Sequence, residues 1–276
     1  MGFLDKLLSG VGIDVSEHHI RFAQVSIFGG VEELFEVEIP DGLIVDEKIE
    51  KVERVKGILE DKFSSSPLKK SALRTTLLLP ESRVFSTSFI LPNEVKRKEI
   101  LVESKKIAQR EIPIPFTHAD VAVSQGSKES GGTRTTLYAI DSEVISSFSN
   151  VLSVTPLSVV AIEANTKSIL RLISRYREKK FLPKSPKELI AIVDVGHSWT
   201  SIAAYTLKGS NMFSRSISYK HIGEGKIGQS DLSKEVVDSI VETIRQVMVY
   251  FNKRDHKVVS VYLSGFEALD KKLSVE

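Results

Sequence analysis

The chain has 276 residues, of which 41% are hydrophobic and 27% are charged, as in a folded protein with a sizeable core. Its 38 lysines and arginines against 36 aspartates and glutamates give a formal charge of +2, which argues against a broad nucleic-acid-binding face. The absence of cysteine excludes disulfides and thiolate metal sites, and no apolar run reaches the about 20 residues of a membrane span. We therefore expect a cytoplasmic protein that binds no nucleic acid.

The N-terminal segment, residues 1–10, is amphipathic. It is too short, and too weakly basic at its start, for a signal peptide. Two interpretations stay open: a short helix packed on its own domain, or a surface anchor to a partner or to lipid headgroups.

Residues 11–80 predict three strands, then a helix and a fourth strand. Apolar or alternating runs bounded by turn residues indicate the strands, and apolar residues at helical spacing indicate the helix. The strands are expected at Gly12–Val15, Ile20–Ile27, Val31–Ile39 and Leu73–Leu79, and the helix within Asp46–Phe63. This order is how a ribonuclease-H-like, or actin-like, fold begins.

Residues 81–155 are interpreted as an inserted subdomain. The expected elements are a strand at Arg83–Leu91, a helix at Asn93–Arg110 capped by Asn93, a hairpin of Val121–Gln125 with Thr135–Ile140, and a helix at Ser142–Val154. The hairpin loop, GSKESGG, is expected to be exposed and flexible. The six basic residues of the first helix form either a solvated face or a surface for an acidic partner or a membrane.

The rest of the chain predicts a return to the first lobe and then a second copy of its pattern. A strand at Pro156–Ala164 and a helix at Asn165–Phe181 precede a proline-containing linker at Leu182–Lys187. The second copy comprises strands at Leu189–Val195, Thr200–Leu207 and Met212–Tyr219, a helix at Asp231–Lys253, a strand at Val258–Ser264, and a final helical piece within Phe266–Leu273.

This repetition predicts an α/β, duplicated actin-like (ribonuclease-H-like) fold with two lobes and a subdomain inserted in the first lobe. The expected parts are residues 1–10, the first lobe at 11–80 and 156–182, the inserted subdomain at 81–155, and a shortened second lobe at 183–276.

Each half carries an aspartate at the end of its first strand, Asp14 and Asp194, directly before a tight turn. Two facing turns of this kind can hold the phosphates of a nucleotide through backbone N–H groups, while the aspartates hold Mg²⁺ through water. The alternative is that both are ordinary hairpin turns, because turns recruit aspartate for their own geometry.

Several segments together resemble the type IV pilus assembly protein PilM family, relatives of the division protein FtsA. They are MGFLDKL, GIDV with IRFAQV, LLLPESRVFSTSFILPNEV, REIPIP, PLSVVAIEANTKSILR, IVDVGHSWTSIAAY with FSRSISY, and VYLSGFEAL. The pair of LP dipeptides flanking a strand, followed by IPIP, is the part most particular to that family.

The resemblance implies an ATP-binding cleft between two lobes, with ATP and Mg²⁺ as cofactors. The residues it assigns to the nucleotide are Gly12, Asp14, Ser16, Glu17, Asp194, Gly196, His197, Thr200, Ser264 and Gly265, with Asp14 and Asp194 also on the metal. It further implies a scaffold, peripheral to the inner membrane, that grips the N-terminal cytoplasmic tail of a PilN-like single-pass membrane protein and links it to the pilus motor. The tail is expected beside the inserted subdomain, the membrane is reached only through the partner, and the chain self-associates.

Four departures from the family pattern fall on the nucleotide side. Ser16 stands where the first phosphate loop normally has glycine, which costs about 1–2 kcal/mol if that position needs a positive φ. Phe266 replaces a second glycine after Gly265. Only eleven residues, Lys220–Ser230, replace a capping subdomain, and the chain ends eleven residues after Gly265. We therefore expect a weakened or lost ATP site, with no catalytic residue assigned.

Two alternatives stay open. One is an active actin-like ATPase or small-molecule kinase, although no further aspartate stands in a convincing catalytic motif. The other is an FtsA-like cell-division protein, which the C-terminal sequence KKLSVE does not favour because it is not an amphipathic membrane helix.

Overall fold

The computed structural model describes residues 10–26, 30–66, 68, 73–176, 182–219 and 233–265. The expected N-terminal helix, the connection at 220–230 and the final helical piece lie outside these residues. Contacts group the chain into two compact units, residues 1–83 with 140–165 and residues 84–139 with 166–276. Each unit is described by itself, and the lobe boundaries expected from the sequence stay a prediction.

In the described residues, the first unit has one large sheet and a two-stranded hairpin. The strands are β1 (Gly10–Val15), β2 (His19–Val25), β3 (Val31–Glu38), β4 (Ile44–Val45), β5 (Lys48–Ile49), β6 (Leu73–Leu79) and β10 (Leu157–Ala164). The helices are α2 (Val52–Ser65), the short 3₁₀ helix η2 (Glu81–Arg83) and α4 (Ser142–Leu152). The large sheet has the order β10-β6-β1-β2-β3, with β1 antiparallel to β2 and parallel to β6.

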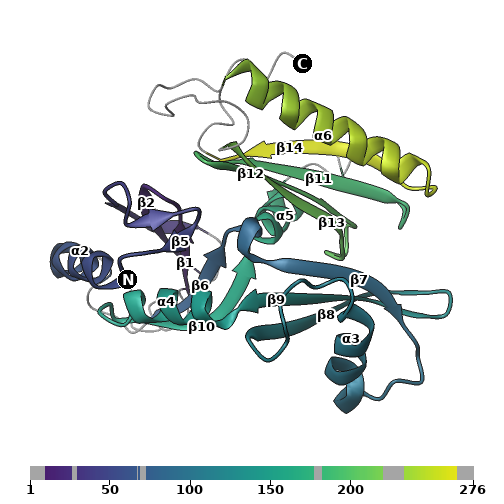
Figure 1. Ribbon diagram of the computed structural model, residues 1–276, viewed down its shortest axis with the longest axis horizontal. Helices are drawn as coiled ribbons and strands as arrows, with labels where there is room; N and C mark the ends of the chain where they lie inside the picture. The colour runs from purple at the N-terminus through teal and green to yellow at the C-terminus, as the bar shows by residue number, and fades with distance from the viewer. Residues whose placement is uncertain are drawn as a thin grey trace. The chain divides into compact units, whose positions relative to one another are not determined.

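An aromatic cluster joins α2 to this sheet. The helix buries Val55, Leu59 and Phe63 along one stripe. The Phe63 ring meets Phe22 of β2 edge to face, with ring centroids 5.1 Å apart. Such pairs add to the stability that burial alone provides. Helices α2 and α4 contact each other as well (Figure 1).

The second unit contains the inserted sheet and the second half of the chain. Its strands are β7 (Phe85–Leu91), β8 (Ala119–Glu129), β9 (Gly132–Asp141), β11 (Glu188–Val195), β12 (Trp199–Tyr205), β13 (Asn211–Ser218) and β14 (Lys257–Ser264). Its helices are the 3₁₀ helix η3 (Arg97–Glu99), α3 (Ile100–Ala108), α5 (Asn165–Tyr176) and α6 (Lys234–Asn252). The described strands form two sheets, β13-β12-β11-β14 and β7-β9-β8.

Helices cover both faces of the β13-β12-β11-β14 sheet. Along β11, Ala191 and Val193 belong to the core under α6, whereas Ile190 and Ile192 belong to the core under α5. This alternation explains why β11 is apolar almost throughout, as expected for a strand buried on both faces. Figure 1 shows α6 lying along the sheet beside β14.

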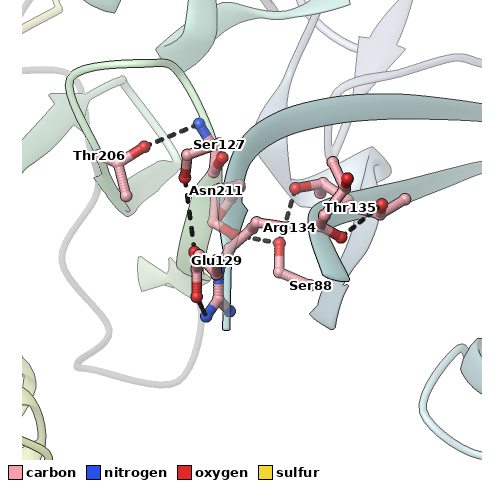
Figure 2. Close-up of polar contacts among 10 residues, drawn as sticks. Ser88, Ser127, Glu129, Arg134, Thr135, Thr206 and Asn211 are labelled. Atoms are coloured by element: carbon pink, nitrogen blue, oxygen red, sulfur yellow. Dashed lines mark hydrogen bonds and ion pairs between the residues drawn. The ribbon is translucent and has the colours of Figure 1, made fainter. Parts of the chain in front are cut away.

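Polar side chains join β7 of the inserted sheet to β13. The Ser86 Oγ lies 3.2 Å from the Ser214 Oγ, and the Asn211 Nδ2 donates to Ser86 Oγ at 3.3 Å. The Ser88 hydroxyl donates to the Asn211 carbonyl oxygen, as Figure 2 shows. These contacts explain why the inserted sheet belongs to the same compact unit as the second half.

The expected duplication is confirmed at the level of strand order. The series β3-β2-β1-β6 and β13-β12-β11-β14 have the same order. In each series the first strand in the chain is antiparallel to the next and parallel to the fourth.

Two expectations about the inserted region are wrong. The helix begins at Ile100, not at Asn93, because residues 93–95 form a turn and Lys96 is extended with ψ of 149°. The expected GSKESGG loop is mostly strand, because β8 runs to Glu129 and β9 begins at Gly132. The turn needs only two residues, and Gly131 supplies the positive φ of 89°. The β4–β5 hairpin was not anticipated.

Among the described helices, none combines the length and the apolarity needed to cross a bilayer.

Candidate functional site

The two predicted loops are closed by equivalent hydrogen bonds. In the first, the Ser16 N–H donates to the His19 carbonyl oxygen at 2.8 Å; in the second, the Gly196 N–H donates to the Trp199 carbonyl oxygen at 2.9 Å. Counting outward from these closures, Asp14 pairs with Arg21, and Asp194 pairs with Ser201. The two aspartates therefore occupy equivalent positions, each within its own unit.

The first loop carries Ser16 without the strain considered above. Among the described non-glycine residues, a positive φ occurs only at Asp46, Glu47 and Asp255. The Ser16 hydroxyl donates to the His19 carbonyl oxygen at 3.0 Å, so this side chain stabilises the turn. Because the φ of Ser16 is not positive, the strain energy expected for a serine at this position does not arise.

A charged cluster surrounds Asp14. The Arg21 Nη1 lies 3.6 Å from Asp14 Oδ2, and the Arg21 Nε donates to Glu36 Oε2 at 2.5 Å. Glu36 Oε1 also lies 3.6 Å from His19 Nε2. Partial burial raises the pKa of Asp14, and the charge of Arg21 opposes this rise. Arg21 of β2 thus lies between a carboxylate on β1 and a carboxylate on β3.

The remaining predicted residues of the first half lie on β1 and in its turn. Gly12 of β1 has open space where a Cβ would stand, and Glu17 lies in the turn itself. His18, next in the turn, places Nδ1 3.2 Å from the Asp41 Oδ1. In the part of the chain that the structure describes, neither His18 nor His19 joins Asp14 in a metal-binding group.

In the second loop, a serine stands at the strand position opposite the aspartate. Ser201, opposite Asp194, places its Oγ 3.2 Å from the Ser216 Oγ. Gly196 and His197 lie in the turn between β11 and β12. Thr200 is fully buried and its hydroxyl bonds to the Tyr219 hydroxyl, which does not favour its predicted role at the phosphates.

Ser264 and Gly265 lie beside this second loop. Ser264 is the parallel-strand partner of Asp194, at the carboxyl ends of β14 and β11. Gly265 has φ of 100°, and a Cβ there would stand 2.3 Å from the Val195 carbonyl oxygen. A side chain at this position would be strained and would collide with backbone, so Gly265 is required by the local fold.

The donor set at Asp14 does not fit Mg²⁺. Magnesium takes near-octahedral oxygen ligands, and the group nearest to Asp14 on the adjoining strand is a guanidinium that is always positive. Asp194 is flanked instead by the hydroxyl-bearing Ser201 and Ser264, which are compatible with a hydrated cation. Across the described ranges, no group of three or more histidine and acidic side chains could hold a metal ion.

Arg21 and Glu36 were missed as members of this site. The signal was present, because counting outward from a turn closed between residues 16 and 19 places Asp14 opposite Arg21. Glu36 depends on the register of the next hairpin, which contains a shift near Val25. Sequence alone does not determine such a shift.

The inserted sheet with α3 forms a second candidate surface. Its core contains Ala108, Ile112, Leu137 and Ala139. Along α3, Leu101, Val102 and Ile107 remain 42%, 53% and 43% exposed. In the described residues β8 is an edge strand of this sheet, because its only strand neighbour is β9. An exposed edge beside apolar side chains can take an extended peptide.

Comparisons with known proteins place this chain in a family context. The sequence pattern of the family described as "Type IV pilus assembly protein PilM" matches residues 12–230. A comparison with curated proteins gives no match.

Three solved structures illustrate the fold. The "PilM-PilN type IV pilus biogenesis complex" is 15% identical over 96% of this chain and 83% of that chain, with a TM-score of 0.75. A protein from Bacteroides thetaiotaomicron "with actin-like ATPase fold and unknown function" is 13% identical over 100% and 99%, with a TM-score of 0.52. The ethanolamine utilization protein EutJ from Carboxydothermus hydrogenoformans is 11% identical over 96% and 79%, with a TM-score of 0.50. At these identities the likeness shows the fold, which is actin-like.

Proposed function

Because the chain belongs to the family of the type IV pilus assembly protein PilM, we propose that it is a pilus-assembly scaffold. It binds the N-terminal cytoplasmic tail of a PilN-like inner-membrane protein and links this protein to the pilus motor. The chain then lies in the cytoplasm and reaches the inner membrane through the partner. The similarity to a solved complex that contains both PilM and PilN supports this role.

The observation that carries the proposal is the inserted sheet with its helix α3. This part has a core of its own and still exposes Leu101, Val102 and Ile107. Exposed apolar side chains beside an edge strand fit an extended peptide with hydrophobic anchors, which adds a strand and fills side-chain pockets. The tail therefore docks against α3 and the β8 edge.

The decisive experiment is a calorimetric titration of the whole chain with a synthetic tail peptide of the neighbouring single-span membrane protein. We expect a dissociation constant of about 100 µM or tighter. Val102→Glu on α3 should weaken binding at least about tenfold, because it replaces the most exposed of these three apolar side chains by a charge. Val160→Glu on β10 is the matched control, since Val160 is 52% exposed and Val102 is 53% exposed.

Absence of saturable binding to the wild-type chain would rule out the scaffold role in this form. Equal loss of affinity in both valine variants would contradict a docking site on α3. Self-association stays a prediction, and sedimentation of the chain with and without the peptide tests it.

We further propose that the nucleotide site is weakened. The Thr200 hydroxyl is hydrogen-bonded to the Tyr219 hydroxyl, and the positive Arg21 lies 3.6 Å from Asp14. Both contacts disfavour the binding of Mg²⁺-ATP. Calorimetry with Mg²⁺-ATP should give a dissociation constant weaker than about a millimolar. Affinity in the micromolar range, with turnover, would favour the active ATPase or kinase alternative.

A further inference from the structure

Arg21 places a positive charge beside Asp14. It lies on β2, and its strand partners are Asp14 on β1 and Glu36 on β3. Its guanidinium lies 3.6 Å from Asp14 Oδ2 and 2.5 Å from Glu36 Oε2. A fixed positive charge therefore sits between two carboxylates.

The second half of the same chain provides an internal reference. The residues equivalent to Asp14, Arg21 and Glu36 are Asp194, Ser201 and Ser216. There the two serine hydroxyls lie 3.2 Å apart, and neither carries a charge. Both halves thus carry the aspartate, and its strand partner is an arginine in the first half and a serine in the second.

We propose that Arg21 takes the place of the divalent cation at the first loop, so that Asp14 binds no Mg²⁺ there. A guanidinium stays charged at all accessible pH values and donates several fixed hydrogen bonds to carboxylate oxygens. It lies 3.6 Å from the Asp14 carboxylate and repels a second positive charge there. A phosphate-bearing ligand at this loop would meet an arginine rather than a metal ion, and its binding there would not depend on Mg²⁺.

The inference is independent of the pilus role, because it concerns one loop and its metal requirement. It can be tested with Mn²⁺ alone as the probe, by electron paramagnetic resonance of the free ion during titration of the full chain. The single variant Asp14→Asn should bind Mn²⁺ with the same affinity as the wild-type protein. In Arg21→Ser, which reproduces the arrangement of the second half, Mn²⁺ affinity should rise at least about tenfold.

The gain in Arg21→Ser should vanish when Asp14→Asn is added, which assigns it to that carboxylate. Arg215→Ser is the matched control, because it removes one exposed basic residue from β13, a strand of the other unit. If Arg21→Ser does not fold, Arg21→Gln keeps a hydrogen-bonding side chain without the charge and should show the same gain.

Two results would overturn the proposal. One is a wild-type Mn²⁺ site that Asp14→Asn abolishes. The other is a folded Arg21→Ser or Arg21→Gln chain with no gain in affinity. Titrating the same samples with the tail peptide keeps the two proposals apart: the variants should bind it like the wild type, whatever the metal results show.

Discussion

Gly265 and Val195 lie in backbone contact at the carboxyl ends of β14 and β11. A Cβ on Gly265 would stand 2.3 Å from the Val195 carbonyl oxygen and 2.7 Å from its amide nitrogen. The φ of 100° at Gly265 is also one that L-residues rarely adopt. The backbone at the start of the loop after Asp194 therefore packs against position 265, where only glycine fits.

Gly265→Ala should lower the free energy of unfolding by about 1–3 kcal/mol, because strain and a collision with backbone add together. Urea unfolding followed by circular dichroism measures this loss. Gly12→Ala is the control, since a Cβ at Gly12 meets nothing within 4 Å and its φ is not positive. Equal stability of the two variants would contradict the close approach.

Asp14 gives a prediction about pH. The surrounding protein partly dehydrates this carboxylate, whose side chain is 44% exposed, and its pKa is raised despite the opposing charge of Arg21. A raised pKa means that ionisation costs the folded chain free energy, so the cost appears as the pH rises above the ordinary value of 3.8. Asp14→Asn should therefore raise the melting temperature at neutral pH, and the gain should fade as the pH falls toward 3.8.

Thermal unfolding at a series of pH values tests this behaviour. Asp238→Asn, at an exposed position of α6, serves as the control for removing a carboxylate. A lower melting temperature of Asp14→Asn at neutral pH would mean that the pair with Arg21 outweighs the loss of hydration.

The duplication was predictable because both halves repeat one local pattern, a short apolar strand that ends in aspartate and a tight turn. Local residues determine such a hairpin, and its closure at Ser16 or Gly196 follows from them. The β4–β5 hairpin shows the opposite case. Its turn residues, Asp46 and Glu47, have positive φ without any glycine, and Arg83 donates to the Asp46 carbonyl oxygen from 37 positions away.

The inserted region shows the same limit. Residues 93–99 carry charge without apolar periodicity, so the start of α3 depends on where Ser104 and Ala108 meet the sheet. Likewise, β8 and β9 extend to a two-residue turn because Glu129 and Arg134 pair across it. Such contacts between distant or facing side chains leave no periodic trace in a single sequence.

The Glu129–Arg134 pair predicts a second pH effect. Arg134 donates from Nε to Oε1 and from Nη2 to Oε2, both at 2.6 Å, as Figure 2 shows. These hydrogen bonds lower the pKa of Glu129 below its ordinary value of 4.5. The stabilisation is therefore present above pH 4.5 and is lost as the pH falls through the lowered value.

Glu129→Gln should cost about 1–3 kcal/mol of unfolding free energy at neutral pH, and less as the solution is acidified. Chemical unfolding at both conditions measures the difference. Glu103→Gln is the control, because the Glu103–Lys106 pair is exposed and should contribute less than about 1 kcal/mol. A cost for Glu129→Gln that does not change with pH would contradict an ionic origin.

Ser104 yields a prediction of the opposite sign. It lies on the buried side of α3 with no exposed surface, and in the described part of the chain its Oγ has no hydrogen-bond partner. A buried hydroxyl without a partner costs about 1–3 kcal/mol, and alanine also favours helix more than serine does. Ser104→Ala should therefore raise the free energy of unfolding by about 1 kcal/mol or more.

Ser147→Ala on α4 is the comparison, because the Ser147 hydroxyl donates to the Val144 carbonyl oxygen at 2.8 Å and should give no such gain. Destabilisation by Ser104→Ala would mean that the Ser104 hydroxyl is hydrogen-bonded in solution. Titrating the same samples with the tail peptide would then report whether this hydroxyl also affects binding at the docking surface on α3.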